Sequence, residues 1–127
     1  MDTSVFEDLG LTNGEIKVYI SLAELGSSAA GPIIEKTGLQ NSVVHRALHA
    51  LISKGLITYI IESRGKTYQI SDPKNFLEYL DEKRHKFERI IPELQRRKEA
   101  AKEKNEAVTF LGKKGITQMY MSLLNSG

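Results

Sequence analysis

The spacing of apolar residues changes abruptly at Gly55, and this change restricts the fold more than any other feature of the sequence. Residues 40–54 carry apolar side chains three and four positions apart, as an amphipathic helix requires: Val44, Ala47, Leu48, Leu51 and Ile52. Beyond Gly55, β-branched and aromatic residues fill residues 56–61 and return at 67–70, on either side of a turn at 63–66. The sequence therefore predicts a helix followed directly by a β-hairpin.

Two further helices are predicted before this pair. Residues 12–25 carry one apolar stripe, which consists of Ile16, Tyr19, Ile20, Leu22 and Ala23. Thr12 and Glu15 have the spacing of a capping box, so we expect this helix to begin there. Residues 27–38 predict a short helix that starts near Ser28 or Ala29, because Pro32 is tolerated only in a first turn.

The connection between the second and third predicted helices is short, about three residues around Leu39. Two short helices joined this closely are typical of a helix-turn-helix. With a helix before them and a hairpin after them, the order of elements is that of a winged helix. We therefore predict a mainly helical α+β fold, with a winged helix-turn-helix domain over residues 1–72 and a long dimerisation helix after it.

The long helix is expected over residues 73–107, with Asp72 as its N-cap. Its apolar side chains keep roughly heptad spacing and are expected to form a homodimer interface: Phe76, Leu80, Phe87, Ile91 and Leu94. Lys83 and Lys98 fall on this stripe, and Pro92 is expected to kink or split the helix. A helix that folds back on its own domain is the alternative to a dimer.

The last segment, residues 108–127, predicts a short strand over Val108–Leu111 and a helix over Thr117–Leu124. One strand and one helix cannot form an independent core. We therefore interpret this segment as the beginning of a further, C-terminal domain.

Three sequence blocks resemble one known family, the TrmB-type regulators. These blocks are LGLT with Glu15, Lys17, Val18 and Tyr19 in residues 9–19, ALHALISKGLI in residues 47–57, and SRGKTYQI in residues 63–70. Members of the family are mostly archaeal winged-helix proteins, and many sense sugars. The resemblance covers about residues 8–82. It implies a DNA-binding transcriptional regulator whose C-terminal effector domain is essentially missing from this chain, so no small-molecule effector is expected here.

The polar side chains of the third helix and of the hairpin are the candidate DNA contacts. Those predicted to bind DNA are Gln40, Asn41, Ser42, His45, Arg46, His49, Lys54, Arg64 and Lys66. Asn can bind adenine, and Arg can bind guanine or phosphate. Where family members often carry Arg, Lys and Tyr in this helix, the chain has Asn41, Val43 and His45. The target site therefore need not be shared.

The charge of the chain needs a local explanation. Residues 1–72 contain six Lys and Arg against eight Asp and Glu, although the whole chain has a net charge of +2. Residues 37–72, which contain most of the candidate DNA contacts, hold four Lys and Arg against only Glu62 and Asp72. We therefore expect the acidic residues to face away from DNA, since phosphate contact depends on where charges lie.

Other functions are less well supported. The chain has no cysteine and no catalytic constellation, so we expect no enzyme. His45 and His49 have a metal-compatible spacing but lack a third ligand, so neither a metal nor a cofactor is expected. The absence of a signal peptide and of long apolar stretches predicts a cytoplasmic protein that does not associate with a membrane. The alternative is a winged-helix adaptor that binds only protein, which an exposed apolar patch on the third helix would favour.

Overall fold

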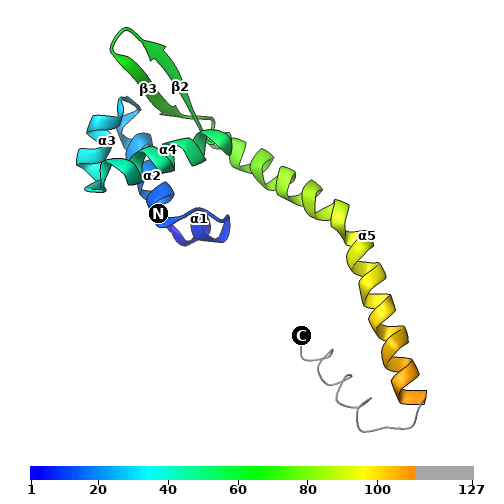
Figure 1. The fold of residues 1–127 in the computed structure, drawn as a ribbon. Coiled ribbons are helices and arrows are strands. Elements are labelled where there is room, and N and C mark those ends of the chain that lie inside the picture. Colours follow the sequence, from blue (N-terminus) through cyan, green and yellow to red (C-terminus); the bar gives the residue numbers. More distant parts are fainter. Residues whose placement is uncertain (111–127) are drawn as a thin grey trace. The chain divides into compact units, whose positions relative to one another are not determined.

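The computed structural model describes residues 1–110, and Figure 1 shows their arrangement. The helices are α1 (Ser4–Asp8), α2 (Asn13–Leu25), α3 (Ala30–Thr37), α4 (Asn41–Ser53) and α5 (Asn75–Phe110). The strands are β1 (Ser27–Ser28), β2 (Ile57–Glu62) and β3 (Gly65–Ile70). A first compact unit spans Met1–Lys83, and a second begins at Arg84. The predicted mainly helical winged helix is confirmed.

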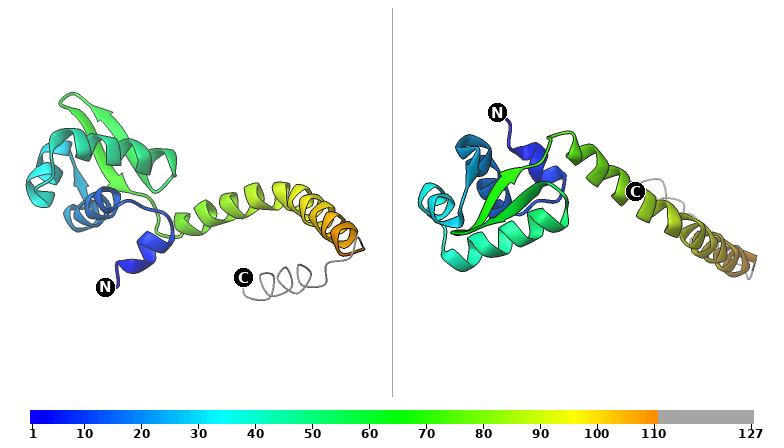
Figure 2. Two further views of the ribbon diagram at one scale, coloured as in Figure 1. Left: turned by 60° about the horizontal axis from the view of Figure 1, so that its bottom comes forward. Right: turned by 90° about the horizontal axis from the view of Figure 1, so that it is seen from above.

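The sheet is antiparallel, with the strands in the order β1-β3-β2. Strands β2 and β3 form the predicted hairpin, in which Tyr59 lies opposite Tyr68. Strand β1 was not predicted: Ser27 and Ser28, expected at the start of a helix, pair with β3 instead. Strand β3 is therefore central, and β1 and β2 form the two edges of the sheet. Figures 1 and 2 show the hairpin extending beyond the three helices α2, α3 and α4.

The helix boundaries follow from local sequence. The Thr12 hydroxyl accepts the Glu15 N–H at 3.2 Å, and the Glu15 carboxylate accepts the Thr12 N–H at 3.4 Å, which completes the predicted capping box. Gly38 ends α3 in a left-handed conformation, with φ of 69°. Three residues then separate α3 from α4, as a helix-turn-helix requires.

The core of the first unit forms where α2 and α4 pack against each other and against the base of the hairpin. Its largest fully buried side chains are Val18, Leu22, Ile33, Val44, Leu48, Leu51, Leu56 and Ile57. Gly14 lies at a close approach of the two helices, because a Cβ added there would be 3.4 Å from Val43 Cγ1. This packing fixes which side of α4 faces outward.

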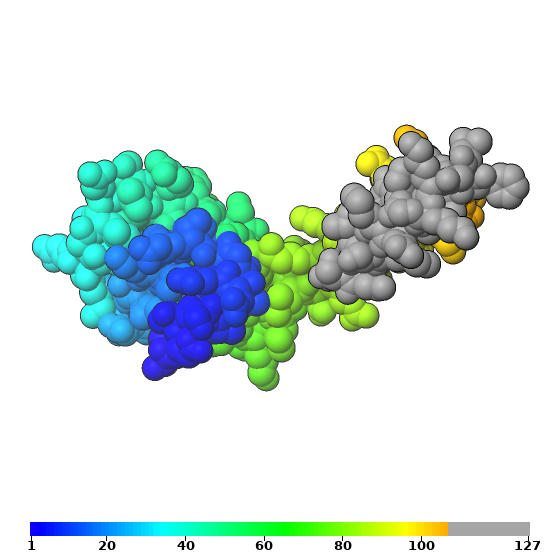
Figure 3. Space-filling view, turned by 90° about the horizontal axis from the view of Figure 1, so that it is seen from below, coloured from blue at the N-terminus to red at the C-terminus, as the bar shows by residue number. Residues whose placement is uncertain are grey.

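An aromatic cluster attaches both ends of the winged helix to each other. The ring centroids of Phe6, Tyr19 and Phe76 lie 5.2–5.7 Å apart. Burial raises the pKa of the Tyr19 phenol. Figure 3 shows the N-terminal residues, in dark blue, against the green residues where α5 begins. Phe76, predicted to lie in a dimer interface, instead packs within its own domain, and helix α1, which supplies Phe6, was not predicted.

Helix α5 begins two residues later than predicted. The Asp72 carboxylate accepts the Lys74 N–H at 3.0 Å in the turn before it, and the Asn75 amide donates to the Gly55 carbonyl at 3.2 Å. The helix passes through Pro92 without a break, so of the two alternatives expected there, a kink or a split, the split is wrong. Among the described residues, neither this helix nor any other is long and apolar enough to cross a membrane.

The predicted strand at Val108 is also wrong. Residues 108–110 continue α5, and the rest of the predicted strand and the helix over Thr117–Leu124 lie outside the described residues. A strand needs a hydrogen-bonding neighbour, whereas each residue added to a helix finds its partner within the same segment.

A charged pair joins α2, α4 and α5 within the first unit. The Lys54 ammonium donates to the Glu15 carboxylate, whose side chain is only 7% exposed. The Lys54 nitrogen also lies 6.0 Å from the centroid of the Tyr79 ring, and the Tyr79 hydroxyl donates to the Leu9 carbonyl at 3.3 Å. The pair therefore links the start of α2 to the end of α4 and to the beginning of α5.

Glu15→Gln is expected to lower the free energy of unfolding by about 1–3 kcal/mol, because the amide keeps the capping box but loses the ionic bond to Lys54. Urea denaturation of the purified protein measures this change. Glu35→Gln, at an exposed position on α3, is the matched control and should stay within about 0.5 kcal/mol of the wild type. Equal changes in the two variants would show that the pair contributes nothing.

Candidate nucleic-acid interface

Helix α4 has one buried and one polar face. Val44, Ala47, Leu48 and Leu51 point into the core. The six side chains predicted to contact DNA from this helix and its N-cap are all exposed: Gln40, Asn41, Ser42, His45, Arg46 and His49. The helix contains no acidic residue, and its N-cap Gln40 makes no side-chain capping bond. Its N-terminal N–H groups and its outward face are thus suited to an anionic, hydrogen-bonding surface.

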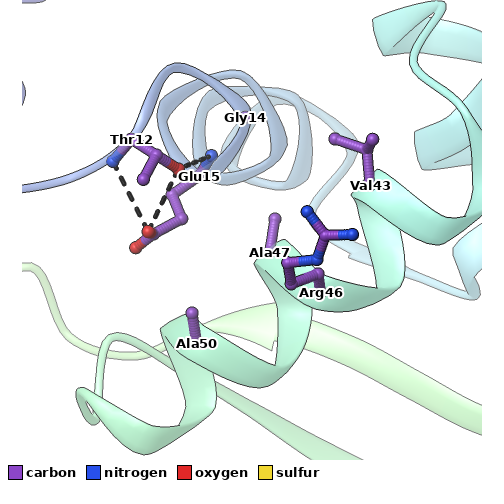
Figure 4. A pocket seen from close by; sticks show the side chains of 7 residues that line it. All are labelled: Thr12, Gly14, Glu15, Val43, Arg46, Ala47 and Ala50. Atoms are coloured by element: carbon purple, nitrogen blue, oxygen red, sulfur yellow. Dashed lines mark hydrogen bonds between the residues drawn. The ribbon is translucent and has the colours of Figure 1, made fainter.

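Arg46 lies beside a hollow of about 290 Å³ between α4 and the start of α2, which Figure 4 shows from close by. The hollow is lined by Thr12, Gly14, Glu15, Val43, Arg46, Ala47 and Ala50. It exists because Gly14, Ala47 and Ala50 carry little or no side chain. The exposed Arg46 side chain consequently has open space beside it. The sequence alone does not indicate this hollow, because no pattern along one helix reveals what a second helix leaves open.

The hairpin adds two cations. Arg64 and Lys66 are exposed on either side of Gly65, whose φ of 116° is one that other residues rarely adopt. The Lys66 nitrogen lies 4.6 Å from the centroid of the Tyr59 ring. Tyr59 was not among the residues predicted to contact DNA. Its place beside Lys66 follows from the hairpin register, in which Ile61 lies opposite Lys66 and Tyr59 opposite Tyr68.

Lys54, predicted to contact DNA, is placed elsewhere by the structure. Its side chain is 22% exposed and its charge is paired with Glu15. If Lys54 left this pair to reach a phosphate, the buried Glu15 carboxylate would lose its ionic partner, which is costly. We therefore remove Lys54 from the candidate interface.

Three cations remain in the candidate interface after Lys54 is removed. Within the part of the chain that the structure describes, Arg46, Arg64 and Lys66 form no ion pair. By contrast, Lys36 on α3 is held by Glu24 on α2 at 2.9 Å. Among residues 37–72, the unpaired cations thus belong to α4 and the hairpin, as the local charge count predicts.

A winged helix with an outward polar helix and a cationic hairpin defines the class of DNA-binding transcriptional regulators. Residues 6–74 match the model of the family described as sugar-specific transcriptional regulator TrmB. This match covers more than half of the chain, and the chain belongs to the TrmB family. The resemblance inferred from the sequence is confirmed, and family and fold are those of DNA-binding regulators rather than of enzymes.

Solved structures share the fold at low sequence identity. TrmBL2, an archaeal chromatin protein, matches with a TM-score of 0.63 and 21% identity, over 86% of this chain and 42% of that one. A MarR-family regulator from Silicibacter pomeroyi matches with a TM-score of 0.52 and 15% identity, over 97% and 74%. YusO from Bacillus subtilis matches with a TM-score of 0.51 and 22% identity, over 84% of this chain and 81% of that one. The chain thus spans less than half of the TrmBL2 chain, and a search of curated proteins finds no match.

Lys66→Ala is expected to reduce the slope of log affinity against log salt by about one, because one phosphate contact is lost. Lys54→Met should leave that slope unchanged while it destabilises the fold, because the Lys54 charge is already neutralised by Glu15. Titration of a labelled duplex at several salt concentrations, well below the melting temperature of each variant, measures both slopes. If Lys54→Met reduces the slope as much as Lys66→Ala, Lys54 contacts DNA after all.

Proposed function

We propose that this chain regulates transcription as a homodimer that binds duplex DNA. Helix α4 enters the major groove, and the β2–β3 hairpin contacts the neighbouring backbone. One observation carries the proposal: the exposed residues of α4 are all polar and include no acid, and the only unpaired cations of residues 37–72 in the described structure lie on α4 and on the hairpin. A regulator of this kind acts on the cell's DNA, in the cytoplasm.

The comparisons support the same proposal. TrmBL2 is an archaeal chromatin protein whose structure shows a novel mode of DNA binding, and the family model is that of transcriptional regulators. A regulator that shares this fold but has its own set of α4 side chains is expected to bind its own DNA sequence.

Each exposed side chain of α4 has a chemically defined part. Asn41, in the first turn, can bond adenine through two hydrogen bonds, and Arg46 can bond guanine in the same way. Gln40, Ser42, His45 and His49 supply further donors and acceptors to bases or phosphates. Arg64 and Lys66 hold the backbone and fix the orientation of the domain without reading sequence.

A protein-binding adaptor is the competing function. It would use an apolar surface on α4, as interfaces usually bury apolar side chains at their centre. Among the described residues, none of the large hydrophobic side chains that are exposed lies on α4. The structure therefore offers an adaptor no docking face on this helix.

Asn41→Ala and Arg46→Ala are each expected to change which bases are preferred, by about 1–3 kcal/mol for a lost bidentate contact. A selection from random duplexes, followed by titration of the enriched and mutated sites, measures this change. Lys17→Ala, an exposed cation on α2, is the control and should alter neither affinity nor preference. Weak binding to every selected and genomic duplex, even at low salt, would favour the adaptor.

The proposed dimer interface lies on α5. In the second unit, Phe87, Ile90 and Leu94 expose 55%, 44% and 47% of their surface, while Ile91 is half-buried. They recur at spacings of three, four and seven, so they form one stripe along the helix. Two ion pairs within the helix, Arg84 with Glu88 and Arg97 with Glu93, lie along the same stretch of α5. Leu80, in the first unit, is also exposed.

A second copy of the chain is the simplest partner for this stripe. Exposed apolar stripes on helices usually mark an interface, and twofold symmetry is the commonest arrangement of identical chains. Two α4 helices related by a twofold axis would bind successive major grooves, so the proposed DNA site is a palindrome.

Phe87→Glu/Leu94→Glu is expected to convert a dimer to a monomer at micromolar concentration, because two carboxylates would enter an apolar interface. Lys86→Glu/Gln95→Glu places carboxylates one residue away, at exposed positions off the stripe, and should remain dimeric. Sedimentation equilibrium measures the mass of both. A monomeric wild-type protein would contradict the dimer and, with it, the palindromic site.

A further inference from the structure

The hollow between α4 and the start of α2 adjoins the candidate interface, and the proposed function does not use it. Its volume of about 290 Å³ lies near the lower end of the range found for small-molecule pockets in proteins. It is lined by the same helix that carries most of the candidate DNA contacts. A hollow of this size can hold a small molecule, and the chemistry of its walls decides which kind.

The floor of the hollow is apolar. Gly14 contributes no side chain, and Ala47 and Ala50 contribute one methyl group each. Val43 lies one turn further toward the N-terminus of α4. Figure 4 shows these residues of α4 facing the start of α2. Their side chains offer contact to a compact hydrocarbon group and no hydrogen bond.

The polar side chains that α2 and its N-cap place in the hollow are already engaged. One oxygen of the Glu15 carboxylate accepts the N–H and the hydroxyl of Thr12, at 3.4 and 3.1 Å, and the other accepts the Lys54 ammonium. The Thr12 hydroxyl also accepts the Glu15 N–H. Because Lys54 neutralises the charge of Glu15, this wall of the hollow exerts little attraction on a further cation.

Arg46 supplies the remaining charge of the hollow. Its side chain is exposed and forms no ion pair with any of residues 1–110. A guanidinium presents two parallel N–H groups, which match the two oxygens of a carboxylate. A ligand complementary to both the charge and the floor therefore has a carboxylate at one end and a compact apolar group at the other.

We propose that the hollow binds a small carboxylic acid with a compact apolar body, and that the bound acid withdraws Arg46 from DNA. This inference rests on the proposed function and deepens it, because it assigns regulation to the same surface. A guanidinium turned toward the hollow cannot present the same two N–H groups to guanine. The expectation that this chain has no small-molecule effector considered only a C-terminal domain, whereas the hollow lies in the winged helix itself.

The first test measures binding to the intact, isotope-labelled chain without DNA, with cyclohexanecarboxylate as the probe. The amide signals of residues 12–15 and 46–50 are expected to shift saturably, with a Kd on the order of 1 mM for so small a ligand. Cyclohexanecarboxamide has the same shape without the charge, and acetate has the charge without the ring. Each is expected to bind about tenfold more weakly, and Arg46→Ala should lose the preference for the acid over the amide.

The second test measures regulation in a variant with a filled hollow. Ala50→Leu should abolish the shifts caused by the acid and still bind DNA, because Ala50 is not among the candidate DNA contacts. Ala23→Leu, the same change at an exposed position of α2, is the matched control. With the acid at about ten times its Kd, the wild type and Ala23→Leu should lose about tenfold in DNA affinity relative to the same concentration of sodium chloride. Ala50→Leu should lose nothing.

Each outcome decides one part of the inference. No saturable shifts, equal binding of the acid, the amide and acetate, or shifts that persist in Ala50→Leu would overturn the site. Shifts in the hollow with unchanged DNA affinity would overturn the regulation. In these cases the proposed function stands, because the affinity for DNA is also measured without the acid. If no duplex binds, the proposed function and the regulation are both wrong, and the shifts still decide whether the hollow binds an acid.

Discussion

The ionic bond between Glu15 and Lys54 holds together the parts on which the interface depends. Glu15 closes the start of α2 as a helix cap, and Lys54 lies at the end of α4. Their bond sets the position of α4 along α2, while the apolar stripe of α4 sets its rotation. The Tyr79 ring beneath Lys54 adds the first turns of α5 to the same assembly. The outward face of α4 is therefore a consequence of packing on its inner side.

This bond also explains why the candidate interface contains so few cations. It removes Lys54 from the surface, so Arg46, Arg64 and Lys66 are the unpaired Lys and Arg among residues 37–72 of the described structure. Three cations per chain give a modest electrostatic contribution to binding. A dimer doubles that contribution, and the hydrogen-bonding side chains of α4 add a term that does not depend on salt.

Features determined by neighbouring residues could be predicted from the sequence. The capping box at Thr12, the three-residue link between α3 and α4 and the hairpin around Gly65 depend only on local chemistry, and the structure has all three. Features that join distant segments could not be predicted from the sequence. The partner of Lys54 lies 39 residues away. Likewise, Ser28 has nothing local that marks it as the partner of a strand.

The same distinction between local and long-range features explains where the structure differs from the sequence-based expectations. Phe76 fits the heptad spacing of α5, but the spacing cannot indicate that Phe6 and Tyr19 already cover it. Val108 has β propensity, but a strand needs a neighbour, and a helix already in progress extends more easily. The polar face of α4, in contrast, follows from its own periodicity, so its six exposed residues could be identified without a structure.

The central claim is that the outward face of α4 and the hairpin together form the DNA-binding surface. The most direct test is an NMR titration of the isotope-labelled protein with a duplex obtained by selection. The account predicts that the amide signals of residues 41–49 and 63–66 shift most, and that those of α1 and of the C-terminal half of α2 remain in place. Shifts confined to α1 and α2, with α4 and the hairpin unaffected, would contradict it.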